Sequence, residues 1–171
     1  KELVSDEHGL DPEALIFDAL TFTLTTGDDE WKPSAVETIE GIRLIKRELP
    51  GVLTSLGVSN LSFGLAAHAR PVLNSVMLYH AVQAGLDMAI VNPAHITPYI
   101  EIPDEQRQLT EDLIFNRRPD ATERLVTALY ATMNDFDLFK RLARLYFAAA
   151  SFSETARRLE RLASARAWPA R

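Results

Sequence analysis

The stretch EALIFDALTFTL, at residues 13–24, is a nearly continuous apolar run rich in β-branched and aromatic side chains. Two similar runs follow it, VLTSLGV at residues 52–58 and LDMAIVN at residues 86–92. Continuous rather than alternating apolar character is typical of a strand that is covered on both faces, as in a parallel sheet. The sequence therefore predicts three buried strands at these positions.

A helical pattern follows each predicted strand, at residues 34–49, 69–84 and 103–116. Ser34, with Glu37 three residues later, predicts a capping box at the start of the first helix. Alternating strands and helices are typical of parallel βα units, whose right-handed crossovers place all three strands parallel. As in an arc of a barrel, we expect the strand order to follow the sequence order. Because only three strands are predicted, the chain is either a small open α/β sheet or the last third of a (β/α)8 barrel.

Composition excludes several classes of protein. The 171 residues are 47% hydrophobic and 25% charged, as expected for about one folded domain. Eighteen Lys and Arg against 24 Asp and Glu give a net charge of −6, which disfavours nucleic-acid binding. No apolar stretch approaches the length of a membrane span. The absence of cysteine excludes disulfides and thiolate chemistry, and fits a reducing compartment, so we expect a cytoplasmic protein.

The two ends of the chain differ from its middle. Residue 1 is Lys rather than Met, and the first residues resemble the interior of a folded protein, so we expect a piece of something longer. From about residue 120 no strand pattern is seen, and apolar and arginine positions alternate at helical spacing. We therefore predict a helical tail that begins near residue 120.

Five polar or flexible residues lie near the ends of the predicted strands. In parallel α/β proteins, ligands bind at the carboxyl ends of the strands and in the loops that follow. These positions are the candidates for a binding site: Asp18 in the first strand, Gly57 and Asn60 after the second, and Asn92 at the end of the third. Asp87 precedes the apolar centre of its strand, so we expect it at the opposite rim with a structural role.

Each candidate also has a structural interpretation. Asp18 could form a buried ion pair or cap a loop, since an unpaired buried carboxylate is costly. Asn60 and Asn92 are common turn residues, and Pro93 follows Asn92. Gly57 could permit tight packing or let a flat ring lie against the backbone. The four histidines show no metal-ligand spacing, and no metal site is expected.

Two motifs and their order carry a resemblance to a known family. These are GVSN-x-SF at residues 57–63 and G-x-DM-x-IVN at residues 85–92. With IFDALTFTLTTG before them and EDLIFNRRPDATERL after them, they resemble the pterin-binding (methyltetrahydrofolate-binding) domain of cobalamin-dependent methionine synthases. The resemblance covers roughly residues 1–126 in uninterrupted order. It therefore implies a domain portion at 1–126, followed by a helical tail at 127–171.

The resemblance implies a partial (β/α)8 TIM barrel of the dihydropteroate-synthase-like group, with these strands as the sixth, seventh and eighth. It implies that Asp18 holds the amino-pyrimidine edge of the pterin and that Asn60 bonds pterin N5, with Gly57 in the same pocket. Asn92 is kept as a further pterin-binding candidate because of its place at the carboxyl end of its strand. Methyltetrahydrofolate would be the substrate, and cobalamin, on another domain, would accept the methyl group. The missing N-terminal half of the barrel and the corrinoid domain would be the partners.

The sequence also departs from the family and leaves alternatives open. The family commonly has Asp-Pro-Asn where this chain has Asp18-Ala19-Leu20. One alternative is a non-catalytic barrel remnant that serves as a helical interaction module. Another is a related barrel enzyme with a different pterin or corrinoid partner. Whether the chain is catalytically active depends on completion of the barrel.

Overall fold

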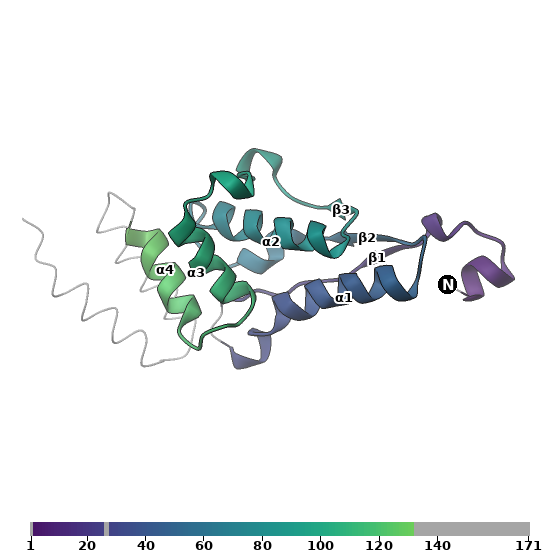
Figure 1. Cartoon of the computed structure of the whole chain (residues 1–171), viewed down its shortest axis with the longest axis horizontal. Helices are drawn as coiled ribbons and strands as arrows, with labels where there is room; N and C mark the ends of the chain where they lie inside the picture. The colour runs from purple at the N-terminus through teal and green to yellow at the C-terminus, as the bar shows by residue number, and fades with distance from the viewer. Residues whose placement is uncertain (1, 26–27, 132–171) are drawn as a thin grey trace, which may run out of the picture.

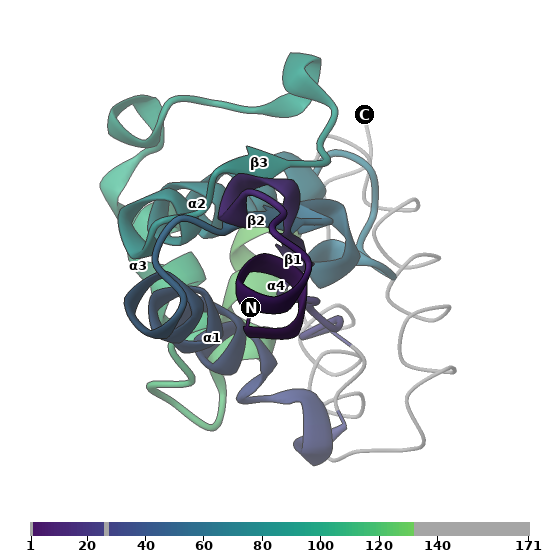
Figure 2. The ribbon, with the colours of Figure 1, turned by 90° about the vertical axis from the view of Figure 1, so that its right-hand side faces the viewer.

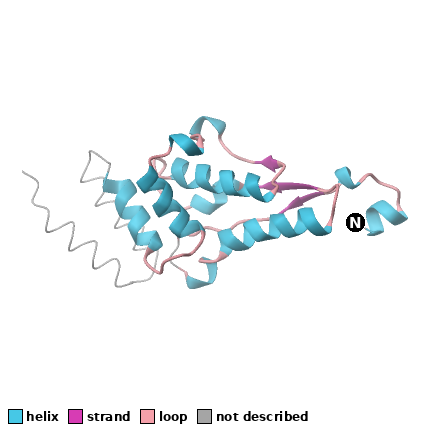
Figure 3. Ribbon diagram, viewed as in Figure 1, coloured by secondary structure: helices cyan, strands magenta, loops and turns pink. Residues whose placement is uncertain are grey.

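A three-stranded parallel sheet forms the centre of the computed structural model, which describes residues 2–25 and 28–131. The strands are β1 (Ile16–Asp18), β2 (Leu53–Leu56) and β3 (Met88–Ala89), and they pair in the order β1-β2-β3 (Figures 1 and 3). Parallel pairing in chain order confirms the prediction. The strands are shorter than the apolar runs that contain them, and most of the predicted tail at 127–171 lies outside the described residues.

Each strand is followed by a helix at the predicted place. The α-helices are α1 (Ser34–Glu48), α2 (Arg70–Ala84), α3 (Asp104–Ile114) and α4 (Ala121–Ala131). Short 3-10 turns complete the loops, namely η2 (Pro12–Ala14), η3 (Asp29–Trp31), η4 (Val58–Ser62), η5 (Pro93–His95) and η6 (Tyr99–Glu101), and a π-helical turn, η1, spans Glu2–Glu7. The mixed α/β class is therefore confirmed.

The predicted capping box of α1 is wrong. Ser34 is the first residue inside the helix, and its Oγ accepts a hydrogen bond from the Phe22 amide at 3.0 Å. The Glu37 amide bonds the Pro33 carbonyl instead of the Ser34 hydroxyl. The Ser34 hydroxyl, which a capping box would use within the helix, is bonded instead to the loop after β1.

The helices cover one face of the sheet. Viewed along the strands, α1 and α2 lie together on one side of it, and α3 packs on α2 (Figure 2). On the central strand β2, the two side chains that point toward the helices, Thr54 and Leu56, are fully buried. The largest fully buried apolar side chains of this layer are Ile39, Ile42, Leu56, Leu61, Leu73, Met77, Ile114 and Leu125.

The opposite face of the sheet is open in the described part of the chain. Ile16 is 55% exposed, Met88 38% and, just past β3, Ile90 68%. Strand side chains alternate between the two faces, so these residues belong to the face that carries no helix. The expectation of strands buried on both faces is therefore wrong for the described residues. The apolar runs supply side chains for two faces, of which only one is covered.

Candidate functional site

Asp18 is the last residue of β1 and points to the open face. Its Cα pairs with that of Ser55 on β2, and its side chain is exposed. Its Oδ1 accepts a hydrogen bond from the Leu20 amide at 2.9 Å, which closes a tight turn. No donor among the described residues reaches Oδ2. The expectation of a buried Asp18 is wrong for the described part, and one carboxylate oxygen is free for a ligand.

Asn60 lies in η4, directly after β2. Its amide N–H donates to the Gly57 carbonyl at 3.1 Å, and its carbonyl accepts from the Phe63 amide at 3.1 Å. Its side chain is exposed. A Cβ on Gly57 would stand 3.1 Å from Asn60 Nδ2, closer than ordinary packing. The absence of a side chain at Gly57 therefore leaves the space in which the Asn60 amide lies.

The register of the sheet places the Asp18 carboxylate and the side-chain amide of Asn60 on the same face. Ser55 lies opposite Asp18, and the Ala19 amide donates to the Ser55 carbonyl at 3.2 Å, so pairing continues past the end of β1. Position 57 is two residues beyond Ser55, and residues two apart in an extended chain point to one face. The carboxylate and the amide thus lie at the carboxyl edge of the sheet, on its open side.

Hydrogen bonds tie the loop after β1 to the turn after β2. The hydroxyls of Thr23 and Thr25 both donate to the Phe63 carbonyl, at 2.7 and 2.8 Å. The Leu24 amide donates to the Leu61 carbonyl at 3.2 Å. Sequence reasoning missed both threonines, because they lie in or beside a run that was predicted to be strand. These hydrogen bonds fix the loop that follows Asp18 against the turn that contains Asn60.

Asn92 uses its amide in a local turn. It precedes η5, and its Oδ1 accepts a hydrogen bond from the Ala94 amide at 3.1 Å, while Nδ2 lies 3.4 Å from His95 Nδ1. The side chain is exposed. No contact among the described residues brings Asn92 to Asp18 or Asn60. The register places Asp18, Gly57 and Asn60 on one face of the sheet, whereas the Asn92 side chain is engaged in its own turn.

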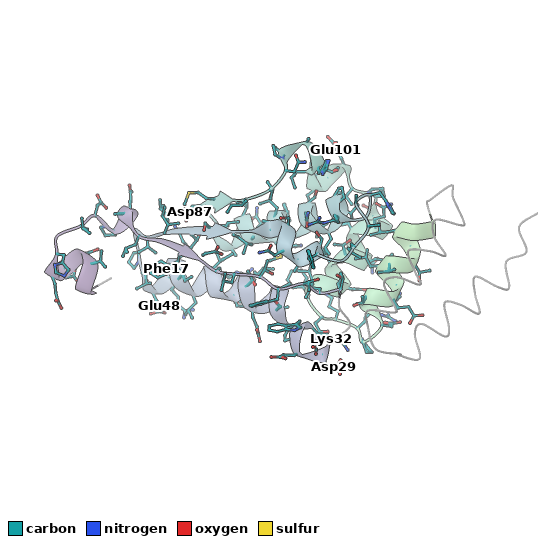
Figure 4. The ribbon with its side chains drawn as sticks, turned by 180° about the vertical axis from the view of Figure 1, so that it is seen from behind. Phe17, Asp29, Lys32, Glu48, Asp87 and Glu101 are labelled. Atoms are coloured by element: carbon teal, nitrogen blue, oxygen red, sulfur yellow. The ribbon has the colours of Figure 1, made fainter. Side chains whose placement is uncertain are left out.

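Asp87 stands at the amino end of β3, opposite the candidate site. Its carboxylate accepts hydrogen bonds from Lys46 Nζ at 2.9 Å, from the Thr54 amide at 2.8 Å and from Thr54 Oγ1 at 2.9 Å. Figure 4 shows Asp87 and Glu48 toward one end of the sheet, and Asp29, Lys32 and Glu101, from loops that follow strands, toward the other. This position fits the structural role expected for Asp87.

A second polar cluster lies among the helices rather than at the sheet. Glu111 on α3 accepts hydrogen bonds from Tyr99 and, at 3.0 Å, from His80 on α2. Tyr99 stacks on Tyr79 with ring centroids 3.8 Å apart. Burial and the Glu111 carboxylate raise the pKa of Tyr99 to about 12. The cluster joins α2, η6 and α3 and is separate in sequence from Asp18 and Asn60.

Residues 2–25 and 28–131 contain neither a metal-binding cluster nor a membrane-spanning helix. No group of three or more His, Asp or Glu side chains in these ranges is arranged to hold a metal ion. In the same ranges, no helix is both long and apolar enough to cross a lipid bilayer.

The described residues form a parallel α/β fold, a class in which ligands bind at the carboxyl edge of the sheet, where Asp18 and Asn60 lie. The profile of the family described as "Pterin binding enzyme" matches residues 1–92. That range is more than half of the chain and contains Asp18, Gly57 and Asn60. The chain belongs to this family of pterin-binding enzymes.

Two curated relatives are similar to the chain. It is 40% identical over 160 residues to the methionine synthase of Mycobacterium tuberculosis, an alignment that covers 94% of this chain and 12% of the relative. It is 46% identical over 122 residues to the methionine synthase of Mycobacterium leprae, covering 71% of this chain and 10% of the relative. The chain thus spans about a tenth of the length of these relatives.

Proposed function

We propose that this chain is the C-terminal part of a methyltetrahydrofolate-binding (β/α)8 barrel that transfers the N5 methyl group to a corrinoid. In this proposal β1, β2 and β3 are the last three strands, and the rest of the barrel comes from another part of the polypeptide. The observation that carries it is the placement of the Asp18 carboxylate and the Asn60 amide on one open face at the carboxyl edge. The family match and the names of the two relatives support it.

Asp18 is proposed to hold the pyrimidine edge of the pterin. A carboxylate that faces N3–H and the 2-amino group accepts two parallel hydrogen bonds, which are stronger than neutral ones because the acceptor is charged. One of its oxygens already accepts the Leu20 N–H, and a carboxylate oxygen has a second lone pair for the ligand. The Leu20 turn fixes the direction of the carboxylate before ligand binds.

Asn60 is proposed to act at N5, the atom that carries the methyl group. Methyl transfer from a tertiary amine is slow unless N5 gains positive character, so a polar group that favours the protonated amine lowers the barrier. A carboxamide both accepts and donates hydrogen bonds, so it serves N5 before and after the methyl leaves. Asn60 is the catalytic residue of this proposal, and Asn92 is kept only as a candidate that borders the pocket.

The corrinoid is the methyl acceptor and is assigned to another domain. The sequence contains no Asp-x-His-x-x-Gly segment of the kind the resemblance associates with the corrinoid domain. When bound, the corrinoid supplies the cobalt nucleophile that takes the methyl group. This chain's own residues bind and orient the pterin and influence the proton at N5.

Asp18→Asn and Asp18→Ala, made in the polypeptide that carries this chain, test the site by equilibrium binding of methyltetrahydrofolate. Asparagine keeps an acceptor for the Leu20 amide but removes the charge, so the turn survives while ligand binding weakens. We expect a loss of about 1.5–3 kcal/mol, roughly tenfold to a hundredfold in affinity. Unchanged folate affinity in Asp18→Asn would remove Asp18 from the proposed site.

Asn60→Ala tests the catalytic step. We expect a larger fall in the rate of methyl transfer than in folate affinity, because the bond to N5 strengthens as the methyl leaves. Equal losses in both would contradict the role at N5. The second candidate function, a non-catalytic interaction module, is favoured by the open apolar face of the sheet. Failure of the wild-type polypeptide to bind methyltetrahydrofolate would support that alternative.

A further inference from the structure

Arg70, the first residue of α2, reaches back to the turn that carries Asn60. Its Nη2 donates to the Ser59 carbonyl at 2.9 Å, and its Nε donates to Ser62 Oγ at 3.0 Å. The Ser62 hydroxyl, which is fully buried, donates in turn to the same Ser59 carbonyl at 3.2 Å. Arg70 therefore binds both ends of the Ser59–Ser62 segment of η4, from the side of the helix layer.

The contacts of this arginine differ from those of Arg117, which follows α3, and of Arg124 on α4. Arg117 and Arg124 lie 3.8 and 3.4 Å from the carboxylate of Asp112. Among the described residues, no carboxylate lies within ion-pair distance of Arg70, which is half-buried. Its described hydrogen bonds all end on η4, so within the described part of the chain the guanidinium charge acts on that turn.

The carbonyl that Arg70 binds belongs to the peptide unit that supplies the Asn60 N–H. That N–H donates to the Gly57 carbonyl at 3.1 Å. A charged donor on a peptide carbonyl polarises the unit and strengthens the bond made by its N–H. Arg70 thereby fixes the backbone of Asn60, while Gly57 leaves space for its side chain.

We infer that Arg70 is a positioning residue that holds the Asn60 amide in the geometry needed at pterin N5. The inference rests on the proposed function and adds a residue to it that sequence reasoning had not marked. Arg70 acts through Asn60, so its loss affects the methyl-transfer step more than folate binding. A displacement of about 1 Å in a catalytic group is enough to lower a rate strongly.

Arg70→Ala and Arg70→Lys, made in the polypeptide that carries this chain, test the inference with methyltetrahydrofolate and cob(I)alamin as probes. For Arg70→Ala we expect the single-turnover methyl-transfer rate to fall about tenfold or more, with folate affinity changed by less than about threefold. Arg70→Lys, which keeps one charged donor, should retain part of the rate. Added guanidinium ion at low millimolar concentration should restore part of the Arg70→Ala rate.

The double variant Asn60→Ala/Arg70→Ala separates positioning from general stability. If Arg70 acts through Asn60, Arg70→Ala costs little further rate once Asn60 is gone. Arg43→Ala is the matched control, because Arg43 is an exposed arginine on α1 that pairs only with Glu40 among the described residues. It should leave rate and affinity unchanged.

Two results overturn the inference while leaving the proposed function intact. One is an Arg70→Ala rate equal to wild type, and the other is the same loss of rate with and without the Asn60 side chain. If Arg70→Ala does not fold, Arg70→Lys with wild-type rate and wild-type affinity overturns it equally. A wild-type polypeptide that does not bind methyltetrahydrofolate overturns the proposed function itself.

Discussion

At the scale of the residue, Leu20 occupies a backbone conformation that its side chain disfavours. Its φ is 52°, in the left-handed region, and its side chain is 57% exposed. The turn persists because the Leu20 amide donates to Asp18 and its carbonyl accepts the Thr38 hydroxyl at 2.8 Å. The bond that orients the Asp18 carboxylate is therefore made at the expense of backbone strain.

Leu20→Asn should relieve part of that strain, because asparagine adopts left-handed backbone more readily than leucine. We expect the free energy of unfolding to rise by about 0.5–1 kcal/mol, measured by urea unfolding of the chain at low protein concentration. Leu20→Ala is the control, since it removes the exposed side chain but keeps the unfavourable φ. If both variants change stability equally, the strain is not what Leu20→Asn relieves.

Tyr99 offers a second residue-scale prediction. Burial and the bond to Glu111 favour its neutral form and raise its pKa to about 12, so the associated stabilisation is present below pH about 10 and is lost as the pH rises toward 12. Glu111→Gln should lower the Tyr99 pKa toward its ordinary value, as followed by phenolate absorbance or NMR titration. Glu101→Gln, which alters an exposed carboxylate nearby, should leave it unchanged. An unaltered titration in Glu111→Gln would contradict this account.

At the scale of the element, sequence reasoning placed helices better than strands. Proline in the first turn of α2 and Gly85 at its end are local signals, and Gly85 adopts a φ of 107° as its C-cap. The apolar run at 13–24 contains only three strand residues, because apolar composition does not separate a strand from an extended loop packed beside it. Helix ends are encoded nearby in the sequence, whereas strand length depends on the partner strand.

The residues at the candidate site also differ in whether the sequence alone could predict their placement. Asp18 and Asn60 were predictable, because the carboxyl ends of parallel strands meet at one edge. Thr23, Thr25 and Arg70 were not, because their partners lie in a different loop or helix and no local pattern marks them. Two further features also depend on tertiary structure: the Oδ2 of Asp18, which no described donor reaches, and the approach of the Asn60 side chain to Gly57.

The Lys46–Asp87–Thr54 contact joins three elements at the amino end of the sheet. Burial raises the pKa of Asp87, but the hydrogen bonds from Lys46 and Thr54 outweigh it and hold that pKa below its ordinary value. The stabilisation is therefore present above about pH 3.9 and is lost as the pH falls through the lower folded pKa. Asp87 acts as a structural clamp on the βα units rather than as part of the candidate site.

Asp87→Asn should lower the free energy of unfolding by about 1–2 kcal/mol, an amount reduced by the partial exposure of the pair. The loss is measured by urea unfolding at neutral pH and should shrink as the pH falls below about 3.9, where the carboxyl group of the unfolded chain takes up its proton. Asp29→Ala, which breaks an exposed pair with Lys32, should have no measurable effect. Asp87→Asn should also leave methyltetrahydrofolate affinity unchanged, and a loss there would contradict its placement at the opposite rim.

At the scale of the whole molecule, helices cover one face of the sheet while the other face and both edges are open in the described part. Each of β1 and β3 pairs with one strand only, β2, within residues 2–25 and 28–131. The open face carries Ile16, Met88 and Ile90, which are all exposed. Exposed apolar faces and unpaired edges favour association with further strands. In the proposed barrel, the other strands would cover this same face and place Asp18 inside it.

The isolated chain should therefore self-associate. We expect sedimentation to show species larger than a monomer at micromolar concentration, and an apolar dye such as ANS to bind the open face. Ile90→Lys, which places a charge on that face, should reduce both, because like charges oppose pairing of the face with a second copy. Leu44→Lys, at an exposed apolar position on α1 in the helix layer, is the matched control and should reduce neither. A monomeric wild-type chain with a cooperative melt and no dye binding would show that the sheet needs no further cover, and would count against the proposed barrel.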